Sequence, residues 1–139
     1  MLLVDELVRL GYLTEVAANQ ALGEHRLVED DVPIDPYVEK YGVTEDQLLK
    51  ARSNLYGIPI KKIDIRTIDP QVLKYIAQES AVQYKFIPLA VDDGILEVGM
   101  VDPEFLSAKD ALQFISAKIG LPYKIVLVAQ SEFDKAVEM

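Results

Sequence analysis

The stretch FIPLAVDDGILEVGM, residues 86–100, carries the strongest structural signal in the chain. Two apolar runs, residues 86–91 and 95–100, are separated by Asp92-Asp93-Gly94. Asp-Gly is a strong hairpin signal because the favoured tight turns require positive φ angles, which glycine adopts at no steric cost. We therefore predict two antiparallel strands joined by a tight turn.

The residues after this hairpin predict a helix, a third strand and a final helix. Asp102-Pro103 places an N-cap residue before a proline, a pair typical of a helix start, and Gly120 provides a stop. The third apolar run covers residues 123–128, and Ser131 is the expected cap of the last helix. On the helix between these runs, the residues expected to be buried are Leu106, Leu112, Ile115 and Ile119.

A hairpin followed by a helical crossover predicts a three-stranded mixed sheet. Residues 86–91 and 125–128 are apolar at successive positions, which indicates that helices cover the sheet. Upstream, residues 58–68 look extended, and Asp69-Pro70 repeats the helix-start signal. A further short helix is predicted at residues 79–84.

Residues 1–57 have a helical pattern throughout. Leu3, Leu7 and Leu10 share one helix face, and Gly11 ends that helix. Further helix starts are expected at Thr14, at Asp35-Pro36, and at Thr44 with Gln47, which form a capping box. The prediction is an α+β fold. A helical hairpin subdomain, residues 1–57, precedes an α/β domain, residues 58–139, that holds a small three-stranded mixed sheet covered by helices.

A weak internal repeat links residues 7–15 with residues 38–45. Both read as a short helix, a glycine break and a longer helix capped by threonine. The repeat is either a duplicated unit or the set of helix-ending and helix-capping residues that any helical hairpin needs, and the sequence leaves both interpretations open.

Composition excludes several classes of function. The 139 residues include 14 basic and 23 acidic ones, a formal charge of −9, which disfavours binding to nucleic-acid phosphates or anionic lipid. There is no cysteine and one histidine, so disulfides, thiolate sites and multi-histidine metal sites are excluded. No apolar run approaches the roughly 20 residues of a membrane span, and the start MLLVDEL lacks the basic region of a signal peptide. We expect a cytoplasmic chain with no nucleic-acid partner and no direct membrane insertion.

No motif assembles a catalytic site. The P-loop, the GxGxxG fingerprint and the GxSxG elbow are all absent. Carboxylate pairs such as Asp30/Asp31 fall at expected turns or helix starts, where acids are favoured for structural reasons, and His25 is expected to be a solvated surface residue. We therefore predict no catalytic residue, no metal ligand and no cofactor, and the ligand-binding residues are unknown. An enzyme would need an unrecognised carboxylate site.

The densest basic run is Lys61-Lys62 with Arg66, on a segment expected to be extended. It is either a plain solvated edge or a contact for a phosphate or an acidic partner.

The chain resembles the N-terminal domain of the secretion ATPase superfamily, which comprises the type II secretion ATPases and the type IV pilus assembly ATPases. The resemblance covers residues 44–139 and rests on an ordered series of glycine, proline and aspartate positions. These signature positions are Gly57, Pro59, Asp69, Pro70, Pro88, Asp93, Gly94, Asp102 and Pro103.

The resemblance implies a non-catalytic protein-interaction domain. In this family the ATP-binding core lies C-terminal to the domain, and the domain attaches the hexameric motor to the cytoplasmic domain of an inner-membrane platform protein. The implied partners are therefore that platform protein and the ATPase core of the parent chain, at a cytoplasmic location peripheral to the inner membrane. We expect exposed apolar residues of the helical half to form the docking surface, because transient interfaces have a small apolar centre.

The family also implies an alternative function, because one branch binds cyclic di-GMP through two tandem helical motifs. Residues that match these motifs are Leu7, Gly11, Leu13 and Leu22 in the first copy and Val38 and Gly42 in the second. The Arg-Leu-Gly positions hold Leu2, Leu3 and Val4 in the first copy and Pro33, Ile34 and Asp35 in the second, and His25 replaces a glutamine. Loss of the arginine removes a group that stacks on bases and pairs with phosphate, and residues 1–60, with 5 basic and 11 acidic residues, oppose a dianionic ligand.

Overall fold

A computed structural model of the chain describes residues 1–28 and 32–138. The contacts divide the chain into two compact units, Met1–Gly57 and Ile58–Met139, each with its own buried core. We call them the first and second units. The carboxylate pair Asp30/Asp31 lies outside the described residues.

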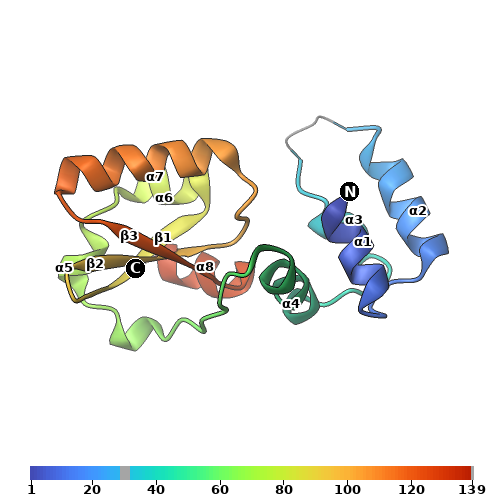
Figure 1. Ribbon diagram of the computed structural model, residues 1–139, viewed down its shortest axis with the longest axis horizontal. Helices are drawn as coiled ribbons and strands as arrows, with labels where there is room; N and C mark the ends of the chain where they lie inside the picture. The colour runs from blue at the N-terminus through green and yellow to red at the C-terminus, as the bar shows by residue number, and fades with distance from the viewer. Residues whose placement is uncertain (29–31, 139) are drawn as a thin grey trace. The chain divides into compact units, whose positions relative to one another are not determined.

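The first unit consists of four helices among the described residues, and the two longest begin after a threonine cap. The helices are α1 (Leu2–Arg9), α2 (Glu15–His25), α3 (Asp35–Glu39) and α4 (Glu45–Tyr56) (Figure 1). Thr14 and Thr44 have extended backbones, and their hydroxyls accept hydrogen bonds from Ala17 and Gln47 N–H, both at 3.1 Å. The capping box predicted at Thr44 is confirmed, because the Gln47 side chain accepts in return from Thr44 N–H at 2.9 Å.

The two halves of the first unit share a turn geometry. Gly11 and Gly42 have φ angles of 80° and 96°, values that favour glycine. The next residues donate back across the turn, Tyr12 N–H to the Leu7 carbonyl at 2.9 Å and Val43 N–H to the Val38 carbonyl at 3.4 Å. The sequence repeat therefore corresponds to one helix–glycine–threonine turn used twice.

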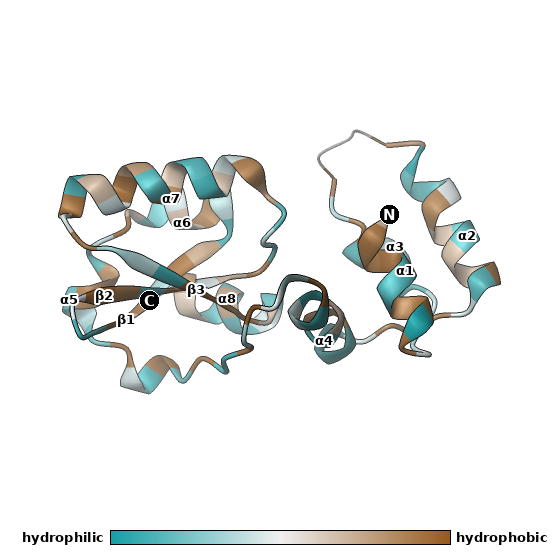
Figure 2. Cartoon of the chain, in the orientation of Figure 1, coloured by the Kyte–Doolittle hydropathy of each residue, from teal (hydrophilic) through white to brown (hydrophobic). Residues whose placement is uncertain are grey.

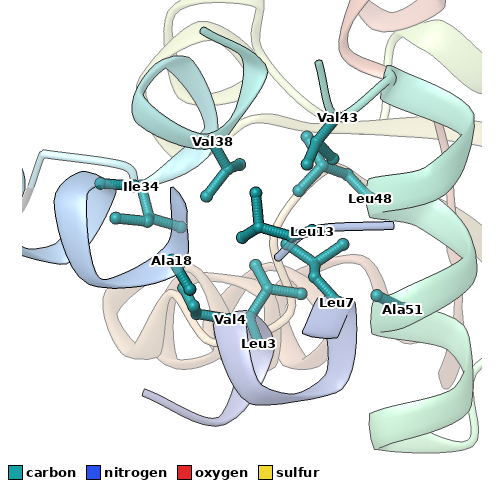
Figure 3. Close-up of a cluster of buried hydrophobic side chains, with 11 residues drawn as sticks. Leu3, Val4, Leu7, Leu13, Ala18, Ile34, Val38, Val43, Leu48 and Ala51 are labelled. Atoms are coloured by element: carbon teal, nitrogen blue, oxygen red, sulfur yellow. The ribbon is translucent and has the colours of Figure 1, made fainter. Parts of the chain in front are cut away.

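One cluster of aliphatic side chains holds the first unit together. Figure 3 shows these side chains pointing towards one another, with Leu13 near the centre. The buried members are Leu3, Val4, Leu7, Leu13, Ala18, Ala21, Ile34, Val38, Val43, Leu48 and Ala51. Every helix of this unit contributes to the cluster, so the unit has a core that does not draw on the sheet.

The second unit confirms the predicted α+β class and the mixed sheet. The strands β1 (Phe86–Asp92), β2 (Ile95–Met100) and β3 (Tyr123–Leu127) lie in the order β1-β2-β3. β1 and β2 pair antiparallel, and β2 and β3 pair parallel. The other elements are η1 (Ile65–Thr67), α5 (Pro70–Leu73), α6 (Gln78–Tyr84), α7 (Leu106–Ile119) and α8 (Gln130–Val137) (Figure 1).

Two separate cores lie on the two faces of this sheet. On one face, α6 and α7 cover Phe86, Leu96, Val98 and Met100. On the other, α8 covers a second set with Ile87, Leu89, Val101, Val126 and Val128 among its members. A side chain on Gly99 would bring its Cβ within 2.8 Å of Val128 Cγ1, so the second face is packed too closely there for any other residue.

The segment that enters the second unit is joined to the free edge of β3. The Pro59 carbonyl accepts from Leu127 N–H at 2.8 Å, and Lys61 N–H donates to the Leu127 carbonyl at 2.9 Å. Close by, Lys61 pairs with Glu97, a buried carboxylate on β2 that also faces Lys124 Nζ at 3.7 Å. These contacts close part of an edge that would otherwise be open.

Two of the predicted helix starts and one predicted extended segment are wrong. The helix expected after Asp102-Pro103 begins at Leu106, since Pro103 is buried and Phe105 is extended. The last helix starts at Gln130, so Ser131 lies within its first turn instead of capping it. Residues 58–68 are not extended throughout, because they include η1.

Asp35 is also not the N-cap of α3, because the helix begins with it and Ile34 precedes it. The Asp35 carboxylate is instead held by Arg52 of α4, with Nη1 to Oδ2 at 2.9 Å and Nη2 to Oδ1 at 2.7 Å. The Arg52 side chain is 5% exposed and the Asp35 side chain 19%. This bidentate pair ties α3 to α4 beside the aliphatic core.

Arg52→Gln should lower the free energy of unfolding by about 3 kcal/mol, because it leaves a largely buried carboxylate without its charged partner. The matched control is Arg66→Gln, whose guanidinium is 86% exposed and pairs with Asp64; it should cost less than about 1 kcal/mol. Urea denaturation followed by circular dichroism measures both. Equal losses in the two variants would contradict a structural role for the Arg52–Asp35 pair.

Candidate docking groove between α6 and α7

Helix α7 presents two different faces. Ala108 and Leu112 are fully buried in the core on the sheet. A second face, with Ser107, Asp110 and Phe114 at i, i+3 and i+7 spacing, lines a groove beside α6. Figure 2 shows hydrophobic and hydrophilic segments alternating along α7, as two such faces require.

The opposite wall of the groove comes from α6 and from the chain just before it. Lys74, Tyr75 and Ala77 precede α6, and Ser80 and Tyr84 lie on it. The groove has a volume of about 830 Å³, within the range of sites that bind ligands or partner side chains.

Two aromatic side chains that line this groove are exposed, Phe114 to 71% and Tyr75 to 38%. The same two helices expose Leu106 (74%) and Val82 (56%) outside the groove lining. Such a concentration of apolar surface on a folded unit typically marks an interaction site. Leu106, expected to be buried, is exposed because it lies on the opposite side of α7 from the buried Ala108 and Leu112.

One aromatic wall of the groove is fixed by ring contacts. The Tyr84 ring lies 5.5 Å from the Phe86 ring and 6.2 Å from the Phe105 ring, centroid to centroid. Phe86 is fully buried, so Tyr84 is anchored to the core. A wall that is already ordered loses little conformational entropy when a partner binds.

The charged residues that line the groove are Lys74, Lys118 and Asp110. Neither lysine forms an ion pair within 4.0 Å in the part of the chain that the structure describes. Two unpaired cations beside apolar side chains give the groove a local positive character in a chain whose net charge is −9.

The first unit exposes apolar residues as well. Leu2 on α1 and Val16 on α2 are 63% and 69% exposed, and Leu27 after α2 is 87% exposed. The sequence placed the docking surface on exposed apolar residues of this helical unit, without singling out particular ones. The second unit differs because its exposed aromatic side chains Phe114 and Tyr75 line a concave site, which the sequence did not suggest.

Several signature positions fix the backbone around the β1–β2 hairpin and around the boundary between the two units. Asp93 and Gly94 form the turn of the hairpin with φ angles of 53° and 75°, as the Asp-Gly signal predicted. Pro88 is buried in β1, where the register shifts before Ala90. Gly57 ends α4 in the left-handed conformation at φ 66°.

The other signature positions are also structural. The Asp69 side chain caps α5 by accepting from Gln71 N–H at 2.9 Å, with Pro70 as the first helical residue. Asp102 Oδ1 accepts from Glu104 N–H at 2.9 Å in the turn before α7, where Pro103 is buried. None of these contacts brings polar side chains together as a reaction would need.

His25 is not the solvated residue that was expected. Its Nε2 lies 2.6 Å from the Val32 carbonyl oxygen, and its ring meets the Tyr37 ring edge-on at 5.4 Å. The histidine is therefore half-buried and links the end of α2 to the chain before α3.

The basic run finds partners within the chain. Lys61 pairs with Glu97, and Arg66 Nε lies 3.2 Å from Asp64 Oδ1. Hydrogen bonds from Arg66, first through its side chain and then through its N–H, lower the pKa of Asp64. Lys61 and Arg66 are thus engaged in holding their own segment.

The described ranges, 1–28 and 32–138, contain no cluster of three histidine or carboxylate residues able to hold a metal ion. None of their helices combines the length and apolarity needed to span a bilayer.

The positions that match the cyclic di-GMP motif serve the fold of the first unit. Leu7 and Leu13 are buried in its core, and Gly11 provides the left-handed turn. Leu2, at a motif arginine position, is exposed. The surroundings are also acidic, because residues 1–60 hold 5 basic and 11 acidic residues. Burial first, and then the nearby charges of Asp35 and Glu45, raise the pKa of Glu39.

Comparison with known proteins gives a family and a fold. Residues 56–139 match the family described as MshEN domain. The type IV pilus assembly ATPase PilB of Myxococcus xanthus is 25% identical over 101 residues, and that of Thermus thermophilus 29% over 106 residues. These matches cover 73% and 76% of this chain but 17% and 12% of the two ATPases.

Solved structures extend the likeness of fold to the whole chain. The structure of MshE with cdg has a TM-score of 0.79 at 20% identity, covering 98% of this chain and 96% of that one. A structure of the N-terminal domain of XpsE has a TM-score of 0.71 at 20% identity, covering 99% and 92%.

Side-chain truncations on the two faces of α7 should differ strongly in how much they lower the free energy of unfolding. Phe114→Ala should change the free energy of unfolding by less than about 0.5 kcal/mol, because the side chain is mostly in solvent. Leu112→Ala, two residues earlier, should cost about 2–5 kcal/mol because it opens a cavity in the core. Thermal and urea unfolding of the two variants measure the difference, and a large loss in Phe114→Ala would show that this ring belongs to the core.

Proposed function

Because the chain belongs to the MshEN domain family, we propose that it is the protein-interaction domain of a type IV pilus assembly or type II secretion ATPase. In this proposal it docks the motor onto the cytoplasmic domain of an inner-membrane platform protein. The same chain would connect to the ATPase core of its parent protein, and the whole would work in the cytoplasm against the membrane.

The observation that carries this proposal is the groove between α6 and α7. Phe114 and Tyr75 expose aromatic surface there, and aromatic side chains dominate the energetics of protein interfaces. The groove is formed by helices that are packed on a sheet, so its shape is set before a partner arrives.

The placement of the signature residues supports a role without catalysis. Turns and caps account for Gly57, Asp69 and Asp93, and burial accounts for Pro88 and Pro103. Residues of this kind keep a surface in shape and perform no reaction. We therefore assign ATP hydrolysis to another part of the parent protein.

Titration of this chain with the platform protein's cytoplasmic domain tests the proposal. We expect micromolar binding, weakened about tenfold in Phe114→Ala because the ring is an interface anchor. Val16→Ala, at a nearly equal exposure on the first unit, is the matched control and should change the affinity less than twofold. Absence of binding by the folded chain would refute docking, and a loss confined to Val16→Ala would move the docking surface to the first unit.

The alternative function is binding of cyclic di-GMP. The likeness to MshE with cdg over 98% of this chain supports testing it. Against it stand Leu2 at an arginine position and Asp35 at a motif glycine position, where Asp35 is engaged by Arg52.

Calorimetry with cyclic di-GMP should therefore give no heat of binding. At a hundredfold excess over the dissociation constant, a bound ligand would also stabilise the fold by about 2.7 kcal/mol, so an unchanged melting temperature is the second expected result. Micromolar binding would establish the chain as a second-messenger sensor and overturn this expectation.

A further inference from the structure

We propose that the groove between α6 and α7 receives an acidic amphipathic helix of the partner. Its apolar face would lie against Tyr75 and Phe114, and its carboxylates would pair with Lys74 and Lys118. This inference rests on the proposed function and names the chemistry of the docking partner.

The shape of the groove fits a helix. The groove-lining face of α7 extends from Ser107 to Ile119, almost the full 14-residue helix, or about 20 Å at 1.5 Å per residue. The exposed Phe114 lies on the same helix face as the polar residues Ser107 and Asp110, at i, i+3 and i+7 spacing. A partner helix that offers apolar residues at i, i+3, i+4 and i+7 matches such a surface.

The charge of the groove selects an acidic partner. Lys74 and Lys118 line it together with one carboxylate, Asp110, so the lining has a net charge of +1. The chain as a whole carries −9. Charges beyond about 8–10 Å are screened at physiological ionic strength, so a bound helix responds mainly to the lining charges, which are two lysines and one carboxylate. The lysines' lack of an ion pair among the described residues leaves both available.

The two ends of the groove differ, which gives the bound helix a direction. Lys118 lies in the last turn of α7, whereas Tyr84 contacts Phe105 just before its first turn. The carboxylate that pairs with Lys118 should therefore face the last turn of α7, and the apolar residue that meets Phe114 should lie about one helical turn before it.

A pair of 18-residue helical peptides tests the inference directly. Both carry leucines at i, i+3, i+4 and i+7, and they differ only in flanking glutamates or flanking lysines. In NMR titrations of the full chain, the acidic peptide should bind and perturb Tyr75, Phe114 and Lys118, and the basic peptide should bind at least tenfold more weakly. Equal binding of the two peptides, or perturbations outside the groove, would overturn the inference.

Charge reversal provides the matched variants. Lys74→Glu with Lys118→Glu should weaken the acidic peptide about tenfold, the sum of two surface ion pairs. The control, Lys50→Glu with Lys135→Glu, has the same net charge at exposed sites on α4 and α8 and should weaken it less than twofold. Equal losses would show that only net charge matters and would reject the groove.

The same variants separate this inference from the proposed function. If the platform protein's cytoplasmic domain binds both double variants equally well, docking stands and the acidic helix in the groove is wrong. If the acidic peptide binds in the groove and the platform domain does not bind at all, the groove assignment stands and the platform partner is wrong. Displacement of the peptide by cyclic di-GMP would reassign the groove to a nucleotide.

Discussion

The central strand β2 contributes residues to the hydrophobic cores on both faces of the sheet, and the packing of the second unit depends on this constraint. Leu96, Val98 and Met100 point to the face that α6 and α7 cover. At Gly99 a side chain would project to the other face, where Val128 leaves no space for it. Because strand side chains alternate, both faces need helices above them. The position of α7 is therefore set by the sheet, and the groove follows from that position.

Helix α7 has more apolar residues than the sheet can cover. Leu112 and Ala108 are buried, while Phe114 and Leu106 remain in solvent on the same 14-residue helix. Each exposed ring or aliphatic chain costs solubility and contributes little to folding stability. A helix with one face for the core and one for a partner accounts for these residues, and it places the interaction on a rigid element instead of a loop.

Local signals made much of the fold predictable. The Asp93-Gly94 turn and the Thr44 capping box depend on neighbours within four residues, so the sequence displays them directly. The failures involve long-range contacts. Asp35 was expected to cap α3 but pairs with Arg52, 17 residues away, and Leu106 was expected to be buried on a helix that starts three residues later than its proline signal suggests. The groove was not foreseen because its walls come together only when α6 and α7 pack on the same sheet face.

Glu97 gives the sheet a means of rejecting misaligned strands. Its carboxylate lies on the central strand with Lys61 and Lys124 beside it. Sliding β2 by one residue would turn that carboxylate towards Phe86 and Leu112, away from both ammonium groups. An unpaired carboxylate among aliphatic side chains costs several kcal/mol. Glu97 thus raises the free energy of misregistered strand pairings relative to the native one. The aliphatic side chains of the three short strands would discriminate less between these registers.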